Sequence, residues 1–124
     1  MMDEDSFLNP LLAQYYSLRP ADFHDVERLE IRQTTGDEGY VTYLNIEVRH
    51  IDSRETHNLL LSFEGVLNLR LTPPARMALQ IITLEIRSVR SQQWEGVNYS
   101  VKEIEHDTLS FLCRDFTAQL IAIS

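Results

Sequence analysis

The chain has 124 residues, of which 44% are hydrophobic and 24% are charged, as in an ordinary globular domain. This composition excludes collagen, coiled coils and wholesale disorder, and a domain of this length buries about two thirds of its unfolded surface, enough to fold without disulfides or a structural metal. Nineteen acidic residues against eleven basic ones give a formal net charge of -8, which opposes binding to nucleic acid and to anionic membranes.

The first predicted element is a short helix between Asn9 and Pro20. Asn9 followed by Pro10 matches an N-cap and a first helical position, and Pro20 ends the run. Apolar residues recur between them at helical spacing, at Leu11, Leu12, Tyr15, Tyr16 and Leu18. A helix this short is marginal alone, so we expect its apolar stripe to pack against a sheet. A helix whose tyrosines contact a partner is the alternative.

After Pro20 the hydrophobic pattern changes to a period of two, which is typical of strands. Residues 26–33 and 40–49 alternate in this way on either side of the turn cluster 36–39, which predicts a long hairpin. Each strand then has an apolar face and a polar face, so one side of the hairpin is expected to pack against the core.

A second turn, at residues 52–55, leads to a predicted strand over residues 59–63. Glu64 and Gly65 interrupt the pattern and are typical of a bulge. Residues 66–71 then alternate again until two prolines, at positions 73–74, stop the strand.

The second half of the chain shows the same alternation of apolar and polar residues, in a different sequence. Four further alternating runs are separated by turns, over residues 82–87, 97–102, 109–113 and 116–123. Up to eight short strands favour a mainly β fold, an antiparallel meander that forms a sandwich or an open curved barrel, with the one short N-terminal helix over one end or face. One strongly curved sheet with the helix in its concavity is the alternative.

No linker or internal repeat indicates a second domain, so we expect one domain over residues 1–124, with a helical segment over 1–20 and a β-rich body over 21–124. The single cysteine, Cys113, cannot form an internal disulfide, which favours a reducing compartment. The N-terminus is acidic where a signal peptide would be basic, and the apolar runs are too short to cross a bilayer. We therefore expect a cytoplasmic location, with no nucleic acid or membrane partner.

Strand alternation also predicts the core, because the apolar face of each alternating run points inward. The predicted core residues are Leu29, Ile31, Leu44, Ile46, Leu61, Phe63, Leu84, Ile86, Tyr99, Val101, Phe111 and Cys113. In this position Cys113 is expected to have a raised pKa and to be inert.

Few residues indicate chemistry. His50 and His57 flank the loop between two predicted strands, where Asp52 or Glu55 could add an oxygen ligand, but zinc normally takes three or four ligands and no HExxH or CxxC pattern is present. The chain also has no GxSxG, GxxxxGK[ST] or GxGxxG motif. We therefore predict no catalytic residue, no metal and no cofactor, and a small β-rich enzyme is the least favoured alternative.

The only tryptophan lies at the start of a predicted strand. Trp94 next to Gly96 is typical of a large ring that caps one end of the core. The alternative is an interaction site, because an exposed Trp beside a charged residue such as Glu95 can anchor an interface. The sequence leaves both interpretations open.

Several segments carry a family resemblance. Residues 94–99 (WEGVNY) and 103–115 (EIEHDTLSFLCRD) resemble the C-terminal signature of the immunity protein 50 family of bacterial polymorphic-toxin systems. Residues 63–66 (FEGV) and 69–71 (LRL) resemble its middle strands, and the similarity covers residues 25–116. The resemblance implies a small cytoplasmic protein that binds and neutralises a cognate toxin without catalysis. A small ligand-binding or structural β domain is the alternative.

The acidity suggests how such a partner is recognised, because complementary charge speeds association with a basic toxin. The candidate contact residues are Trp94, Glu95, Glu27, Glu30, Glu103, Glu105 and Asp107, with Asp37 and Glu38 nearby in the first hairpin. If the carboxylates converge they form a negative patch, and a solvated surface that keeps the protein soluble is the alternative. Reversing Glu103, Glu105 and Asp107 to Lys is expected to slow association and to leave the fold intact, because exposed charges contribute little to stability.

Overall fold

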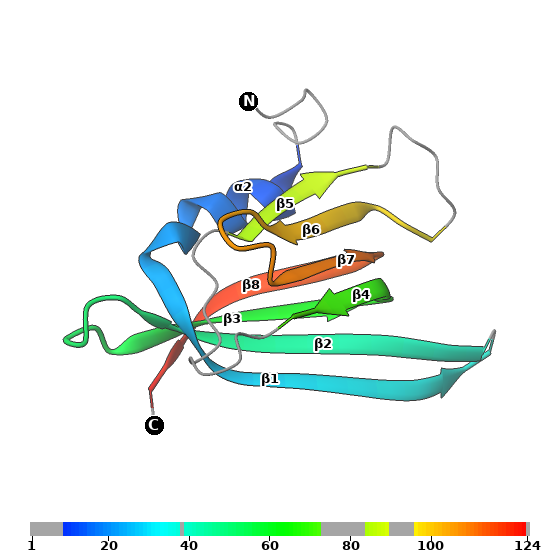
Figure 1. The fold of residues 1–124 in the computed structure, drawn as a ribbon, viewed down its shortest axis with the longest axis horizontal. Coiled ribbons are helices and arrows are strands. Elements are labelled where there is room, and N and C mark those ends of the chain that lie inside the picture. Colours follow the sequence, from blue (N-terminus) through cyan, green and yellow to red (C-terminus); the bar gives the residue numbers. More distant parts are fainter. Residues whose placement is uncertain (1–8, 38, 73–83, 90–95, 124) are drawn as a thin grey trace.

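A computed structural model describes residues 9–37, 39–72, 84–89 and 96–123. The elements in chain order are helix α2 (Pro10–Ser17), 3-10 helix η1 (Pro20–Asp22), and strands β1 (Phe23–Gly36), β2 (Gly39–His50), β3 (His57–Glu64), β4 (Leu67–Leu71), β5 (Leu84–Ser88), β6 (Tyr99–Glu103), β7 (Leu109–Cys113) and β8 (Asp115–Ala122) (Figure 1). Every described strand pair is antiparallel. The predicted mainly β class with a short N-terminal helix is confirmed.

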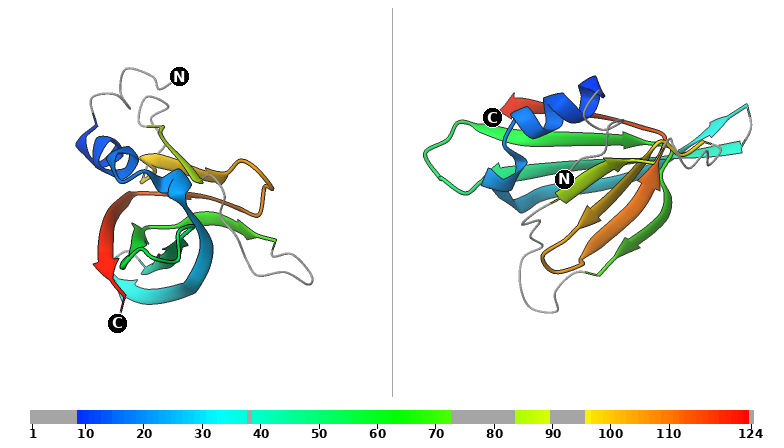
Figure 2. Two further views of the ribbon diagram at one scale, coloured as in Figure 1. Left: turned by 90° about the vertical axis from the view of Figure 1, so that its left-hand side faces the viewer. Right: turned by 90° about the horizontal axis from the view of Figure 1, so that it is seen from above.

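The strands form two four-stranded sheets, in the orders β1-β2-β3-β8 and β4-β7-β6-β5. Each sheet is a meander of three consecutive strands completed by a fourth that comes from elsewhere in the chain, β8 beside β3 and β4 beside β7. The predicted interruption at Glu64 and Gly65 is the place where the chain passes from the first sheet to the second. Figure 2 shows the sheets meeting at this corner and splaying apart from it, which is the open sandwich form of the predicted fold.

The helix is capped as the sequence predicts. The side-chain oxygen of Asn9 accepts hydrogen bonds from the backbone N–H groups of Leu11 and Leu12 at 2.9 and 3.2 Å, and Pro10 occupies the first turn. Its buried face carries Leu12 and Tyr15 into the core, so packing against the sheets is confirmed.

Polar side-chain contacts fix the helix across the open side of the sandwich, and one of them joins the Tyr15 hydroxyl to the carbonyl oxygen of Leu84 on β5. The Tyr16 hydroxyl donates to the carbonyl oxygen of Ile86 on edge strand β5 at 3.0 Å, and Gln14 Nε2 donates to the carbonyl oxygen of Ala118 on edge strand β8 at 3.1 Å. Because β5 and β8 are edges of different sheets, α2 joins the two sheets and covers unpaired strand edges.

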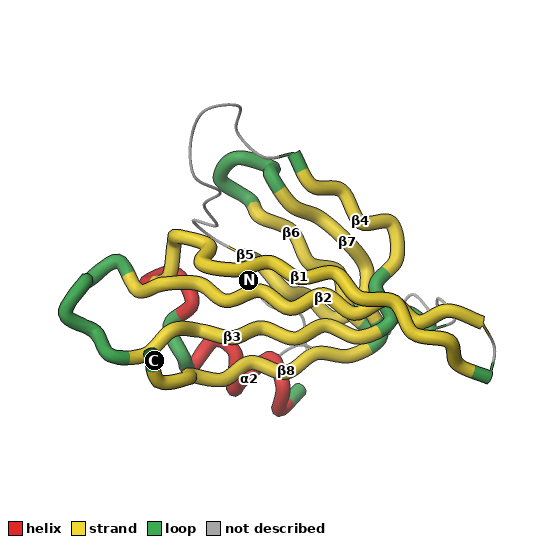
Figure 3. Tube along the Cα trace, turned by 90° about the horizontal axis from the view of Figure 1, so that it is seen from below, coloured by secondary structure: helices red, strands yellow, loops and turns green. Residues whose placement is uncertain are grey.

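The core lies between the sheets and follows the predicted alternation, with two exceptions on β1. Ten of the twelve predicted residues are buried, but Leu29 is half-buried and Ile31 is 49% exposed. The β1–β2 hairpin extends beyond β3 and β8 (Figure 3), but Ile31 lies short of this extension, because its partner Leu44 pairs with Phe63 of β3. β1 is the edge strand of the sheet, so Leu29 and Ile31 lie at the margin of the core. The prediction for Ile31 is therefore wrong. Alternation tells which face of the strand a residue occupies, but it does not tell whether other residues pack over that face.

Cys113 is fully buried in β7, as predicted. Burial, with a smaller contribution from the negative charge of Asp115, raises the pKa of its thiol to about 12. The thiol is therefore neutral and unreactive in the folded protein at neutral pH.

This raised pKa predicts a loss of stability in alkali. The unfolded chain releases the Cys113 proton near the ordinary pKa of 9.0 while the folded chain retains it, so the free energy of unfolding should fall by about 1.4 kcal/mol per pH unit above that pKa. Urea unfolding across pH 8 to about pH 10 measures the slope. Cys113→Ala should reduce this slope, even if the variant is itself less stable at neutral pH. Equal slopes in both proteins would show that the Cys113 thiol does not cause the alkaline loss of stability.

Candidate functional site

The corner between the sheets brings together the segments that carry the family resemblance. Gly65 has a φ of +70° and directs the chain from β3 into β4. Opposite it, the Arg114 N–H donates to the carbonyl oxygen of Glu64 at 2.9 Å, and the Arg114 side chain forms an ion pair with the Glu64 carboxylate. Asn98 Nδ2 donates to the Arg114 carbonyl oxygen at 2.8 Å. The FEGV segment, the described part of WEGVNY and the CRD segment thus meet at one place and shape the corner.

A groove of about 480 Å³ lies on the outside of this corner, and we call it the corner groove. Its lining includes Tyr40 from the β1–β2 hairpin, which is 77% exposed, Leu67 from β4, and Gly96. Trp94 and Glu95 directly precede Gly96 and lie outside the described residues, so their predicted role in partner binding stays a prediction.

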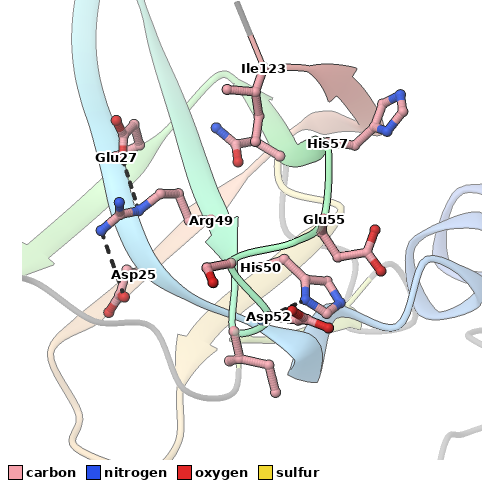
Figure 4. Close-up of a pocket in the computed structure, with 11 residues that line it drawn as sticks. Asp25, Glu27, Arg49, His50, Asp52, Glu55, His57 and Ile123 are labelled. Atoms are coloured by element: carbon pink, nitrogen blue, oxygen red, sulfur yellow. Dashed lines mark hydrogen bonds and ion pairs between the residues drawn. The ribbon is translucent and has the colours of Figure 1, made fainter.

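A second pocket, of about 400 Å³, lies beside the loop that joins β2 to β3 (Figure 4). Its lining comprises Asp25, Glu27, Arg49, His50, Ile51, Asp52, Ser53, Glu55, His57, Asn58 and Ile123. We call it the acidic pocket, because four carboxylates and one guanidinium line it.

Arg49 neutralises only part of the acidic pocket. Its Nε atom lies 3.0 Å from Glu27 Oε2, and its Nη2 atom lies 3.9 Å from Asp25 Oδ2. Figure 4 shows Arg49 between these two carboxylates, with Glu55 on the loop across the pocket. Arg54 forms an ion pair with Asp52 at 3.0 Å and lowers its pKa, so this carboxylate is ionised but balanced, and the excess negative charge comes from Asp25, Glu27 and Glu55 against Arg49. The pocket is therefore a negatively charged concavity.

Asn58 is the one buried polar group in the wall of the acidic pocket that lacks a partner for one of its atoms. Its side chain is almost fully buried, with 3% of the residue exposed, and its Nδ2 atom donates to Glu47 Oε2 at 2.7 Å. Its Oδ1 atom is buried and accepts no hydrogen bond from the described part of the chain. A carboxylate accepts but does not donate, so Glu47 fixes the amide with its nitrogen toward the carboxylate and its oxygen unpaired.

His50 and His57 flank the β2–β3 loop as predicted, but they do not face one another. His50 Nδ1 accepts from the Asp52 N–H at 2.9 Å, whereas His57 Nδ1 contacts Thr56 Oγ1 at 3.0 Å. Figure 4 shows the two imidazoles well apart, with Glu55 between them. Within residues 9–37, 39–72, 84–89 and 96–123, no group of three or more His, Cys, Asp or Glu side chains is arranged to hold a metal ion.

The predicted acidic contact residues do not form a single patch. Glu27 lines the acidic pocket, and Glu30 is exposed further along β1, where it accepts from Asn45 Nδ2 at 3.3 Å. Glu105 and Asp107 are exposed in the turn between β6 and β7, in the other sheet. Figures 1 and 3 place this turn far from the tip of the β1–β2 hairpin, where Asp37 lies. Glu38 is outside the described residues.

Glu103 requires a correction, because it is fully buried and not on the surface. Its carboxylate accepts hydrogen bonds from the N–H groups of Glu105 and His106 at 2.7 and 2.8 Å, and from Thr108 Oγ1 at 3.3 Å. It therefore holds the β6–β7 turn together from within. The expectation that Glu103 can be reversed to Lys with the fold intact is wrong.

The family model of immunity protein PIM8 matches residues 8–119. The chain belongs to this immunity protein family. Neither the curated proteins nor the solved structures contain a match to it. The resemblance to immunity proteins is thus confirmed, although the matching family is PIM8, and the number 50 is not confirmed. The match also includes helix α2, which the resemblance did not cover.

The structure gives a role to two residues of the segments that carry the resemblance. Gly65 and Arg114 build the corner of this PIM8 chain, so their role is structural. None of the helices in the described part of this PIM8 chain has the length and apolar character needed to span a membrane. The sequence analysis grouped His50, Asp52, Glu55 and His57 at this loop, but it missed Asn58, because Asn58 looks like an ordinary polar position on the outer face of a strand.

Proposed function

We propose that this chain is the non-catalytic immunity protein of a bacterial polymorphic-toxin system, and that it binds and neutralises a cognate toxin in the cytoplasm. The observation that carries the proposal is the PIM8 family match over residues 8–119. The net charge of -8 supports a basic toxin as the partner, because charge complementarity raises the association rate and discriminates against other proteins.

The surface around the acidic pocket supports protein binding. Ile51 and Ile123, both more than half exposed, lie in the lining of a pocket that also carries Asp25, Glu27 and Glu55. Apolar side chains next to charged groups are typical of the contact surfaces of proteins that bind other proteins. The exposed carboxylates of Glu30, Glu105 and Asp107 add to the negative field that a basic toxin would meet.

The test is co-expression with the toxin encoded by the adjacent reading frame. We expect this chain to relieve growth arrest and to elute with the toxin as one complex in size-exclusion chromatography. Because the proposed neutralisation is by binding alone, toxin released from the complex in denaturant and refolded should regain full activity and an unchanged mass. Absence of both rescue and complex would refute the proposal, and a covalently altered toxin would show that the chain is an enzyme.

A further inference from the structure

We propose that the acidic pocket receives an arginine side chain of the toxin, with the Asn58 carbonyl and the surrounding carboxylates as its acceptors. This inference rests on the proposed function for the identity of the partner. The pocket itself is defined by residues of this chain alone, from β1, β2, β3, the β2–β3 loop and the residue that follows β8.

The first argument is the unpaired oxygen of Asn58. Leaving a buried carbonyl oxygen without a donor costs about 1 to 3 kcal/mol, which a donor supplied by a partner would recover. The neighbouring amide nitrogen is already committed to Glu47, at 2.7 Å, so the amide cannot turn to satisfy the oxygen within the chain. The pocket wall therefore holds one acceptor that the described part of the chain leaves unused.

The second argument is the sign of the charge around that oxygen. Asp25 and Glu27 share Arg49, while Glu55, on the loop across the pocket, has no ion pair within the described part of the chain. A donor that enters this field is stabilised if it is cationic. An uncharged donor would satisfy Asn58 but would leave the excess negative charge in place.

The third argument selects arginine as the cation. A guanidinium presents five donors in a planar fork, so it can reach Asn58 and a carboxylate at the same time. It is also less strongly hydrated than an ammonium ion, and the exposed side chains of Ile51 and Ile123 can contact its aliphatic stem.

The experiment uses the full chain and N-acetyl-arginine amide as the probe, followed by amide and Asn side-chain NMR shifts. We expect the largest saturable shifts at Asn58 and along the β2–β3 loop. The citrulline analogue, which has the same shape without the charge, should cause much smaller shifts. Equal shifts with both probes, or arginine-induced shifts no larger at the pocket than at the β6–β7 turn, would overturn the proposal.

Two variants sharpen the test. Glu55→Gln should weaken the affinity for the arginine probe about threefold, because one exposed charge contact is lost, whereas the matched Glu105→Gln in the other sheet should leave it unchanged. Asn58→Leu should weaken the binding of both probes, because the acceptor is lost, and should keep the preference for arginine, because the carboxylates remain. Thermal unfolding checks that this variant folds. Equal effects of Glu55→Gln and Glu105→Gln would show a diffuse charge effect and refute the pocket.

The two proposals fail separately. A toxin complex whose dissociation rate is the same for wild type, Glu55→Gln and Asn58→Leu would overturn the role of the pocket while leaving the immunity function in place. A pocket that binds the arginine probe in a chain that neither rescues growth nor binds the toxin would overturn the immunity function instead.

Discussion

Replacing Glu103 with alanine should lower the free energy of unfolding by about 3 kcal/mol. The Glu103 carboxylate is fully buried and accepts from two backbone N–H groups and the Thr108 hydroxyl. Alanine would leave these three donors buried or half-buried without an acceptor, and hydrogen bonds to a charged acceptor are worth more than neutral ones. Urea unfolding at neutral pH measures the difference.

Two matched variants separate this mechanism from a general loss of charge. Glu103→Gln retains one acceptor oxygen in nearly the same shape, so its loss should be smaller, about 1 kcal/mol. Glu105→Ala removes an exposed carboxylate from the same turn and should change stability by about 0.5 kcal/mol or less. Similar losses for Glu103→Ala and Glu105→Ala would contradict a structural role for the buried carboxylate.

The position of Glu103 changes how binding experiments on this turn are interpreted. A variant of Glu103 that fails to neutralise a toxin would do so through loss of the folded state. Glu105 and Asp107 are exposed in the same turn, so they are the positions there whose reversal to Lys tests charge in toxin binding. The comparison needs unfolding curves for every variant beside the association rates.

The alternation of β6 already contained the signal for Glu103. Tyr99 and Val101 are buried, and Glu103 is the next residue on the same face of the strand. Its charge favoured a solvent position in the sequence interpretation, but a carboxylate can be buried where a tight turn offers backbone donors. The pattern predicted the face of Glu103 correctly. The hydrogen bonds that make burial of its carboxylate tolerable come from the turn that follows.

The sequence predicted local structure well and long-range structure poorly. The Asn9 cap, the hairpin and the core faces follow from rules that act within a few residues. The pairing of β3 with β8 joins segments more than fifty residues apart, and no local pattern encodes it. The acidic pocket depends on that pairing, since it places Ile123 near Asn58.

Gly65→Ala should be among the most destabilising single substitutions in the chain, with a loss of about 3 kcal/mol in the free energy of unfolding. A φ of +70° costs any residue with a Cβ atom about 1 kcal/mol or more. The added Cβ would also lie 2.9 Å from the Cβ of Arg114, which is too close for a normal contact. Arg114 cannot easily withdraw, because its N–H donates to the Glu64 carbonyl oxygen at 2.9 Å.

Gly96→Ala provides the matched control for this corner. Gly96 also has a left-handed backbone conformation, with a φ of +73°, but a Cβ atom there would meet no atom of the described residues within 4 Å. It should therefore show only the conformational cost, about 1 kcal/mol. The difference between the two variants in the free energy of unfolding, measured in urea, isolates the clash with Arg114. The double variant Gly65→Ala/Arg114→Ala should recover little of the loss, because alanine at position 114 keeps the Cβ atom. Equal losses of unfolding free energy for Gly65→Ala and Gly96→Ala would contradict this account. They would show that the corner can open to relieve the clash with Arg114 without loss of stability.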